Sequence, residues 1–168
     1  MSKIMYANYA AIKNEQHIPD AVAQSDLKNG YVVVKGVDEK GKHTATVPGN
    51  ATECKGELWF VWNTVDKPEL DNESDFIIKE GDFAKIFKFK ADYPVYVSKD
   101  LITGEVKTGK YLVADESNAG MVKVVDAATG YAVSLLVTEP LVSAQGAIYL
   151  CDVVIGTSTI TTARSTTE

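Results

Sequence analysis

The sequence has few cysteines and few histidines, and this scarcity excludes the usual signatures of a zinc centre. Its 168 residues contain two of each. Cys54 and Cys151 stand far apart and match no CxxC or zinc-ligand spacing, which favours reduced, buried thiols over a disulfide. His17 and His43 also have no Cys, Asp or Glu at metal-ligand spacing in their own segments. We therefore expect no metal or other cofactor.

Long apolar runs and an excess of positive charge are also missing. No stretch approaches the roughly 18 apolar residues that span a bilayer, and the N-terminus lacks the apolar core of a secretory signal. These absences predict synthesis in a cytoplasm and no membrane partner. Lys and Arg total 17 against 23 Asp and Glu, a net charge of -6. Because binding to a phosphate backbone normally needs a basic face, nucleic acid is not an expected partner.

The composition is that of one soluble domain. Hydrophobic residues make up 45% of the chain and charged residues 24%. A chain of this length buries roughly 70% of the surface that its unfolded form exposes, so it needs neither disulfide nor metal to hold a core.

The first 29 residues have neither a helical nor a strand period that persists. We interpret residues 1–29 as an N-terminal arm outside the core, with a short helix beginning near Pro19, since proline suits a first helical turn. Tyr6, Tyr9 and Ile12 have no obvious partner within the chain. Such segments often become ordered on another chain, which makes these three residues interaction candidates. The alternative is a disordered terminus.

Beyond Gly30 the signals are those of short strands. Residues 31–34 and 44–47 are β-branched or aromatic, and the turn formers at 38–41 between them predict a hairpin. Further strands are expected at 58–62, 83–89, 95–98, 110–114, 121–125, 131–137 and 147–155. This pattern predicts an all-β fold, a small antiparallel barrel or sandwich over residues 30–155, followed by a short polar C-terminal tail at 156–168.

Two of the expected strands are apolar on both sides. In residues 58–62 and 147–155 both alternating sets of positions are hydrophobic, apart from Asp152. Such strands are covered on both faces or make a subunit contact. Trp59 and Trp62 lie three positions apart and so point to opposite faces of a strand. We expect one in the core and leave the other open as an interface anchor.

The candidate catalytic and ligand motifs all fail in detail. Residues 104–110 match GxxxxGK, but Tyr111 replaces the required Ser or Thr and opens a β-type run, which favours a hairpin over a phosphate loop. The alternating acids in residues 71–75 resemble the start of a calcium loop, yet Phe76 replaces its glycine and Asp82 its bidentate glutamate. No GxSxG elbow occurs. We expect a protein without catalytic residues.

The assembled pattern resembles the decoration or cement proteins of tailed bacteriophage heads. The resemblance lies in residues 56–63, the acidic loop after them, residues 78–83, and residues 109–113 before a final apolar strand. It covers about half the chain. It implies a β-rich domain without cofactor that binds the major capsid protein from outside, an extended arm that grips neighbouring subunits, and frequent dimers or trimers. The expected location is the virion, on the capsid exterior.

Two other functions stay open at this point. A phage tail or baseplate component that binds a host surface through carbohydrate would expose Trp59 or Trp62 for stacking on sugar rings. A cytosolic ligand-binding barrel or hydrolase would have a deep pocket with a titratable residue, and Asp152 is the first candidate.

Overall fold

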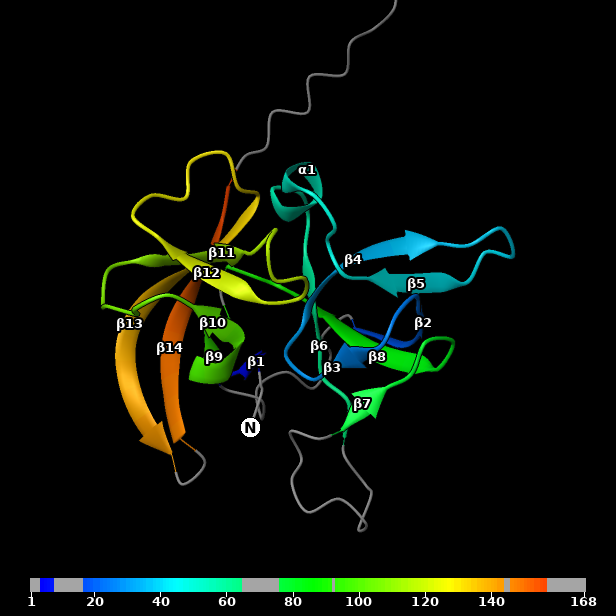
Figure 1. Cartoon of the computed structure of the whole chain (residues 1–168), viewed down its shortest axis with the longest axis horizontal. Helices are drawn as coiled ribbons and strands as arrows, with labels where there is room; N and C mark the ends of the chain where they lie inside the picture. Colours follow the sequence, from blue (N-terminus) through cyan, green and yellow to red (C-terminus); the bar gives the residue numbers. More distant parts are fainter. Residues whose placement is uncertain (1–3, 8–16, 65–75, 92, 144–145, 157–168) are drawn as a thin grey trace, which may run out of the picture.

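The computed structural model describes residues 4–7, 17–64, 76–91, 93–143 and 146–156, and within them the chain is almost entirely β-structure (Figure 1). The all-β prediction is therefore confirmed. One α-helical turn, α1 (Ala51–Cys54), is capped by Asn50, whose side chain accepts hydrogen bonds from the amides of Thr52 and Glu53. A 3-10 turn, η3 (Lys99–Leu101), follows the ninth strand.

Seven strands form an open sheet. In spatial order they are β1 (Ile4–Tyr6), β9 (Val95–Ser98), β14 (Gly146–Ile155), β13 (Val133–Ser143), β11 (Tyr111–Ala114), β12 (Val122–Val125) and β10 (Ile102–Thr103). Every pairing is antiparallel except that of β10 with β12. The hairpin favoured at residues 104–110 is wrong, because β12 lies between β10 and β11 in the sheet.

Five further strands close into a barrel. They are β2 (His17–Ala23), β5 (His43–Thr46), β4 (Val32–Val37), β6 (Trp59–Val61) and β8 (Phe83–Lys88). The predicted hairpin of β4 and β5 is confirmed, with Val34 opposite Thr46 and Val37 opposite His43. Two short strands, β3 (Leu27–Lys28) and β7 (Ile77–Ile78), pair beside the barrel.

The molecule has two hydrophobic cores. The barrel core fills the barrel interior and consists of Ala21, Ala23, Leu27, Val33, Ala45, Trp59, Val61, Ile78, Ala84 and Ile86. The sandwich core lies between the inner face of the seven-stranded sheet and the outside of the barrel wall. It consists of Ile4, Tyr6, Val32, Cys54, Leu58, Phe60, Phe87, Phe89, Val95, Val97, Leu101, Ile102, Leu112, Ala114, Val122, Val133, Leu135, Val137, Cys151 and Val153.

Strand β6 belongs to both cores. Side chains alternate across a strand, so Phe60 points into the sandwich core while Trp59 and Val61 point into the barrel. All three are buried. This arrangement confirms that the strand predicted at 58–62 is covered on both faces.

The described parts of residues 1–29 are not an arm outside the core. Strand β1 pairs with β9, and Ile4 and Tyr6 are 0% and 1% exposed in the sandwich core. Strand β2 completes the barrel, and its Ala21 and Ala23 face the barrel interior. The arm was inferred from a missing period, and strands of three residues or strands with alanine at buried positions give no such signal.

The helix predicted near Pro19 is also wrong, because this residue lies within β2. The pairing of β2 with β8 is irregular between Ile18 and Ala21. Proline has no backbone N–H to donate to a strand ladder, so it is tolerated at such a bulge.

Candidate functional site: the outer face of the seven-stranded sheet

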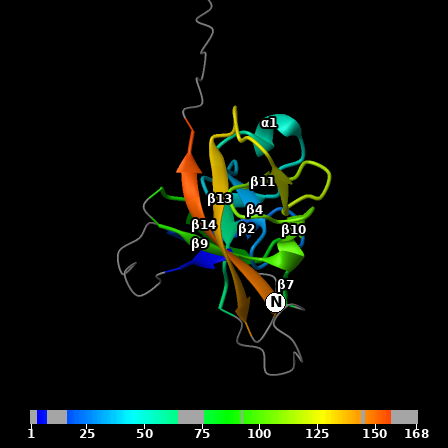
Figure 2. The ribbon, with the colours of Figure 1, turned by 90° about the vertical axis from the view of Figure 1, so that its left-hand side faces the viewer.

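The two sides of the seven-stranded sheet are fixed by strand alternation. On β14, Cys151 and Val153 are buried in the sandwich core, whereas Ile148 and Leu150 between them point to the other side. Figure 2 looks onto that side, with β1, β9, β14 and β13 in front. We call this side of the sheet the outer face.

The outer face is mostly apolar. Six neighbouring strands, β1 to β12 in the spatial order given above, contribute half-buried hydrophobic side chains to this face, and none of these side chains belongs to either core. They are Met5, Tyr96, Tyr111, Val125, Leu136, Leu141, Ile148 and Leu150. Val154 is 39% exposed on the same side. Two exposed carboxylates lie among these side chains, because Glu139 is opposite Leu150 and Asp152 is opposite Leu136. Apolar groups gathered on one face of a sheet mark a protein contact more often than bare solvent.

The hairpin of β13 and β14 projects beyond the rest of this sheet, at the lower left of Figure 1. Strand β9 pairs with β14 only from Ile148 to Cys151, and β11 pairs with β13 only at Leu135 and Leu136. Past a bulge between Val137 and Glu139, β13 pairs with β14 alone among the described residues, whereas β14 still pairs with β9 as far as Ile148. Near the tip, Val142 is 92% exposed.

The projecting part of β13 has an edge with no strand beside it among the described residues. As far as Val137, the backbone of β13 is hydrogen-bonded to the neighbouring segment, since the Val137 amide donates to the Lys110 carbonyl at 2.9 Å. Beyond that point Glu139 and Pro140 follow, both exposed. A charged residue and a proline on an edge strand commonly prevent it from pairing with a strand of another molecule. A partner at this edge would therefore be bound through side chains and not through the backbone.

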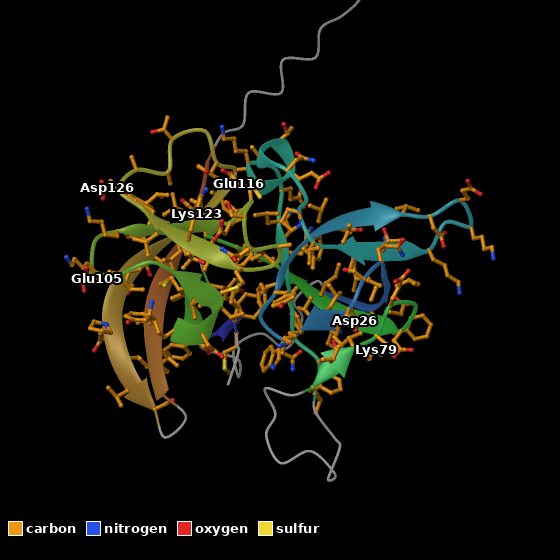
Figure 3. All side chains as sticks on the ribbon, in the orientation of Figure 1. Asp26, Lys79, Glu105, Glu116, Lys123 and Asp126 are labelled. Atoms are coloured by element: carbon orange, nitrogen blue, oxygen red, sulfur yellow. The ribbon has the colours of Figure 1, made fainter. Side chains whose placement is uncertain are left out.

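Charged residues also lie on the outer face. Asp152 and Glu139 are exposed on it, and at the β12 side Lys123 pairs with Glu116 at 3.3 Å (Figure 3). Burial alone lowers the pKa of Lys123, but the hydrogen bond to Glu116 and the nearby negative charges together outweigh it and hold that pKa above its usual value. Polar groups around an apolar centre are the ordinary anatomy of a protein interface.

Among the predicted interaction residues, Tyr6 is a core residue and the prediction for it is wrong. Its hydroxyl donates to the Lys88 carbonyl, and its ring meets those of Phe60, Phe87 and Tyr93 edge to face at 5.2, 5.9 and 5.8 Å. Tyr9 and Ile12 lie outside the described residues. The only sequence signal for burial is the spacing of Ile4 and Tyr6 two positions apart, and a pattern of three residues is too short to predict a strand.

One of the two tryptophans is a core residue and the other is not fully buried. Trp59 is 6% exposed in the barrel core, with its ring nitrogen donating to a Glu57 carboxylate oxygen at 3.2 Å. Trp62 is half-buried and packs against the sandwich core, 5.6 Å from the Phe87 ring. Neither lies on the outer face, so neither anchors it.

Groups that could carry chemistry are dispersed in the described residues. No three His, Cys, Asp or Glu side chains gather there as a metal ion would require. His17 stacks on Phe87 at 5.2 Å, and His43 is exposed at the start of β5. Burial raises the pKa of the Cys151 thiol to about 12, which keeps this group protonated and unreactive. Within the same residues no helix has the length and apolar character needed to cross a membrane.

Comparison with models of known protein families, with curated proteins and with solved structures found no match to this chain.

Proposed function

We propose that this protein is a non-enzymatic structural protein of a virion, which docks on the outside of a phage capsid through the outer face of its seven-stranded sheet. The observation that carries the proposal is the set of half-buried apolar side chains on that face that belong to neither core. A binder of an already folded lattice needs apolar area to bury, and it needs no reacting side chains.

The projecting hairpin supports the same function. Its tip exposes Val142, which follows Leu141 and so points to the other side of the sheet, where it can contact a neighbouring subunit of a lattice. Apolar residues at the centre of a contact contribute most of its affinity, and many weak copies on a symmetric lattice gain from avidity when they also contact each other. We therefore propose the major capsid protein and further copies of this chain as partners.

The other two functions have less support in the structure. Carbohydrate stacking needs an open tryptophan face, whereas Trp59 is buried and Trp62 is half-buried. A ligand inside the barrel would have to displace the buried side chains of the barrel core. Asp152, the candidate acid of a pocket, is exposed on the outer face.

The test is light scattering of the purified protein followed by co-sedimentation with phage capsids that lack it. We expect a stable oligomer that pellets at a fixed ratio to the capsid subunits. Leu150→Asp places a charge at the centre of the outer face and should weaken binding by about a hundredfold, in line with the loss of a buried contact. Val37→Asp is the control, since Val37 is 61% exposed on the barrel.

Thermal melting of both variants confirms that each is folded before binding is compared. A monomer that stays in the supernatant would overturn the proposal. Equal pelleting of Leu150→Asp and the parent protein would overturn the assignment of the outer face.

A further inference from the structure

A pocket of about 470 Å³ lies away from the outer face, where α1 and the start of β6 meet the ends of β13 and β14. Its volume is within the range of about 300–1,000 Å³ that is typical of small-molecule sites. None of the residues that line it belongs to the apolar set of the outer face.

Three of the four chain segments that line the pocket are tied by backbone hydrogen bonds. The amide of Ala132 donates to the Lys55 carbonyl, and the amide of Gly156 donates to the Ala132 carbonyl, both at 2.9 Å. A side chain at Gly156 would clash, because its Cβ would stand 2.4 Å from the Tyr131 carbonyl oxygen. The pocket is therefore formed in the free protein and does not depend on a ligand to assemble it.

The floor of the pocket is apolar. Leu58 and Phe89 are each 2% exposed and Val133 is 6% exposed, and all three belong to the sandwich core. Ile155, 49% exposed, adds an apolar side to the mouth. An aromatic or branched aliphatic group entering here replaces water on carbon surface, which is favourable.

The mouth of the pocket is basic in a protein whose net charge is -6. Its lining has two lysines, Lys55 and Lys88, and one acid, Glu57. Lys88 is engaged with Glu57 at 3.1 Å. The ammonium of Lys55 lies 5.9 Å over the Tyr131 ring and pairs with no carboxylate among the described residues.

Glu57 does not neutralise Lys55, because its charge is already shared. It accepts from Lys88 and from the indole nitrogen of Trp59, and the hydrogen bond from Lys88 holds the pKa of this carboxyl below its usual value. Lys35 adds a further positive charge nearby, with its ammonium 5.3 Å over the Trp59 ring. Among the residues that line the pocket, positive charges therefore outnumber negative ones by one.

From this geometry we propose that the pocket binds a small carboxylate that carries an aromatic or branched aliphatic group. The apolar group lies on Leu58, Phe89 and Val133. The carboxylate is at the mouth, where Lys55 and the Thr52 hydroxyl are donors. This site is separate from capsid docking, and either proposal can fail without the other.

The test is a titration of the full-length, isotope-labelled protein, followed by NMR, with three probes: 3-phenylpropanoate, its neutral amide and acetate. The amide lacks the charge and acetate lacks the ring. We expect 3-phenylpropanoate to shift amide signals of residues 52–58 and 130–133 with a Kd of about 1 mM or below, the weak end of specific binding. Both other probes should bind at least about tenfold more weakly.

Three lysine variants locate the charge that is responsible. Lys55→Gln should weaken binding of the carboxylate by about tenfold and leave binding of the amide unchanged, as expected for one charged hydrogen bond. Lys55→Arg retains the charge and should retain binding. Lys40→Gln, at the exposed tip of the β4–β5 hairpin, is the matched control and should bind as the parent does.

Equal affinity for the carboxylate and the amide would overturn the proposal, as would shifts confined to other parts of the molecule. So would the absence of shifts at about 10 mM probe, well above the expected Kd. Unchanged binding by Lys55→Gln would overturn the assignment of the mouth.

Discussion

The inner face of the seven-stranded sheet is almost wholly apolar, whereas the outer face mixes apolar side chains with charged ones such as Glu139 and Asp152. Leu135 and Leu136 are neighbours on β13. Leu135 points inward and is 2% exposed in the sandwich core, whereas Leu136 points outward and belongs to neither core. The barrel wall covers the inner face, and no described core covers the outer one. Hydrophobicity alone therefore does not distinguish the buried leucine from the half-buried one, and the second layer makes the difference.

The largest expected effect comes from the barrel residue that covers the inner face. Phe60 is fully buried between the sheet and the barrel, and Phe60→Ala should lower the free energy of unfolding by about 3–5 kcal/mol through the cavity it leaves. Urea denaturation measures this loss. Phe83→Ala is the control, because Phe83 is 58% exposed on β8, and it should change stability by about 0.5 kcal/mol or less.

The neighbouring leucines of β13 test the comparison directly. Leu135→Ala should cost about 2–5 kcal/mol of stability, the range for buried leucines. Leu136→Ala should cost about 1 kcal/mol or less, because the side chain keeps contact with water in the free protein. Parallel urea melts of the two variants give both numbers. Similar losses in the two would mean that a further layer covers the outer face.

A smaller effect is expected at the hydroxyl of Tyr6. Tyr6→Phe keeps the aromatic contacts and removes the hydrogen bond to the Lys88 carbonyl, so it should destabilise the protein by about 1 kcal/mol. Thermal unfolding detects a loss of this size. A variant as stable as the parent would indicate that the N-terminal strand contributes only its apolar contacts.

The smallest expected effect is a change in acid sensitivity at the turn that joins β11 and β12. Burial by itself raises the pKa of Asp115, but hydrogen bonds from the Asn118 side chain at 2.8 Å and the Ser117 amide at 3.0 Å outweigh it. The folded-state pKa therefore lies below the usual value, so this carboxylate stabilises the fold above about pH 4. That contribution is lost as the pH falls through the lowered pKa.

Asp115→Asn should thus cost about 1 kcal/mol near neutral pH and lose less further stability on acidification than the parent does. Urea melts at several pH values below about 5 follow the difference. Parallel acid curves for the two proteins would show that this carboxylate is not linked to unfolding.

Strand alternation and turn residues made the main part of the fold predictable from the sequence. The β4–β5 hairpin was predictable because β-branched runs flank a turn ending at Gly41, whose positive φ of 78° suits glycine. The run of apolar residues at 58–62, with both alternating sets of positions hydrophobic, correctly indicated a strand covered on both faces. The N-terminal strands were missed because their partners, β9 for β1 and β8 for β2, lie far along the chain.

The candidate sites were harder to predict for a related reason. The sequence of β14 indicated two dry faces, yet Ile148 and Leu150 point to a face that no described core covers, which depends on the position of the barrel. The pocket brings together Lys55, Lys88 and Ile155 from distant segments. No local pattern marks such a set, because only the packing of the sheet against the barrel brings it together.

The three residues of β6 also limit how the molecule can be divided. A barrel expressed without the seven-stranded sheet would expose Phe60, Phe87 and Phe89 to water, and the resulting aromatic surface would drive aggregation. Barrel and sheet should therefore unfold in one cooperative transition, not as separable modules. A fusion partner or label is better placed at the exposed Glu39 or Lys40 in the β4–β5 turn, which keeps glycine at the positive φ of Gly41, than at any cut between the two halves.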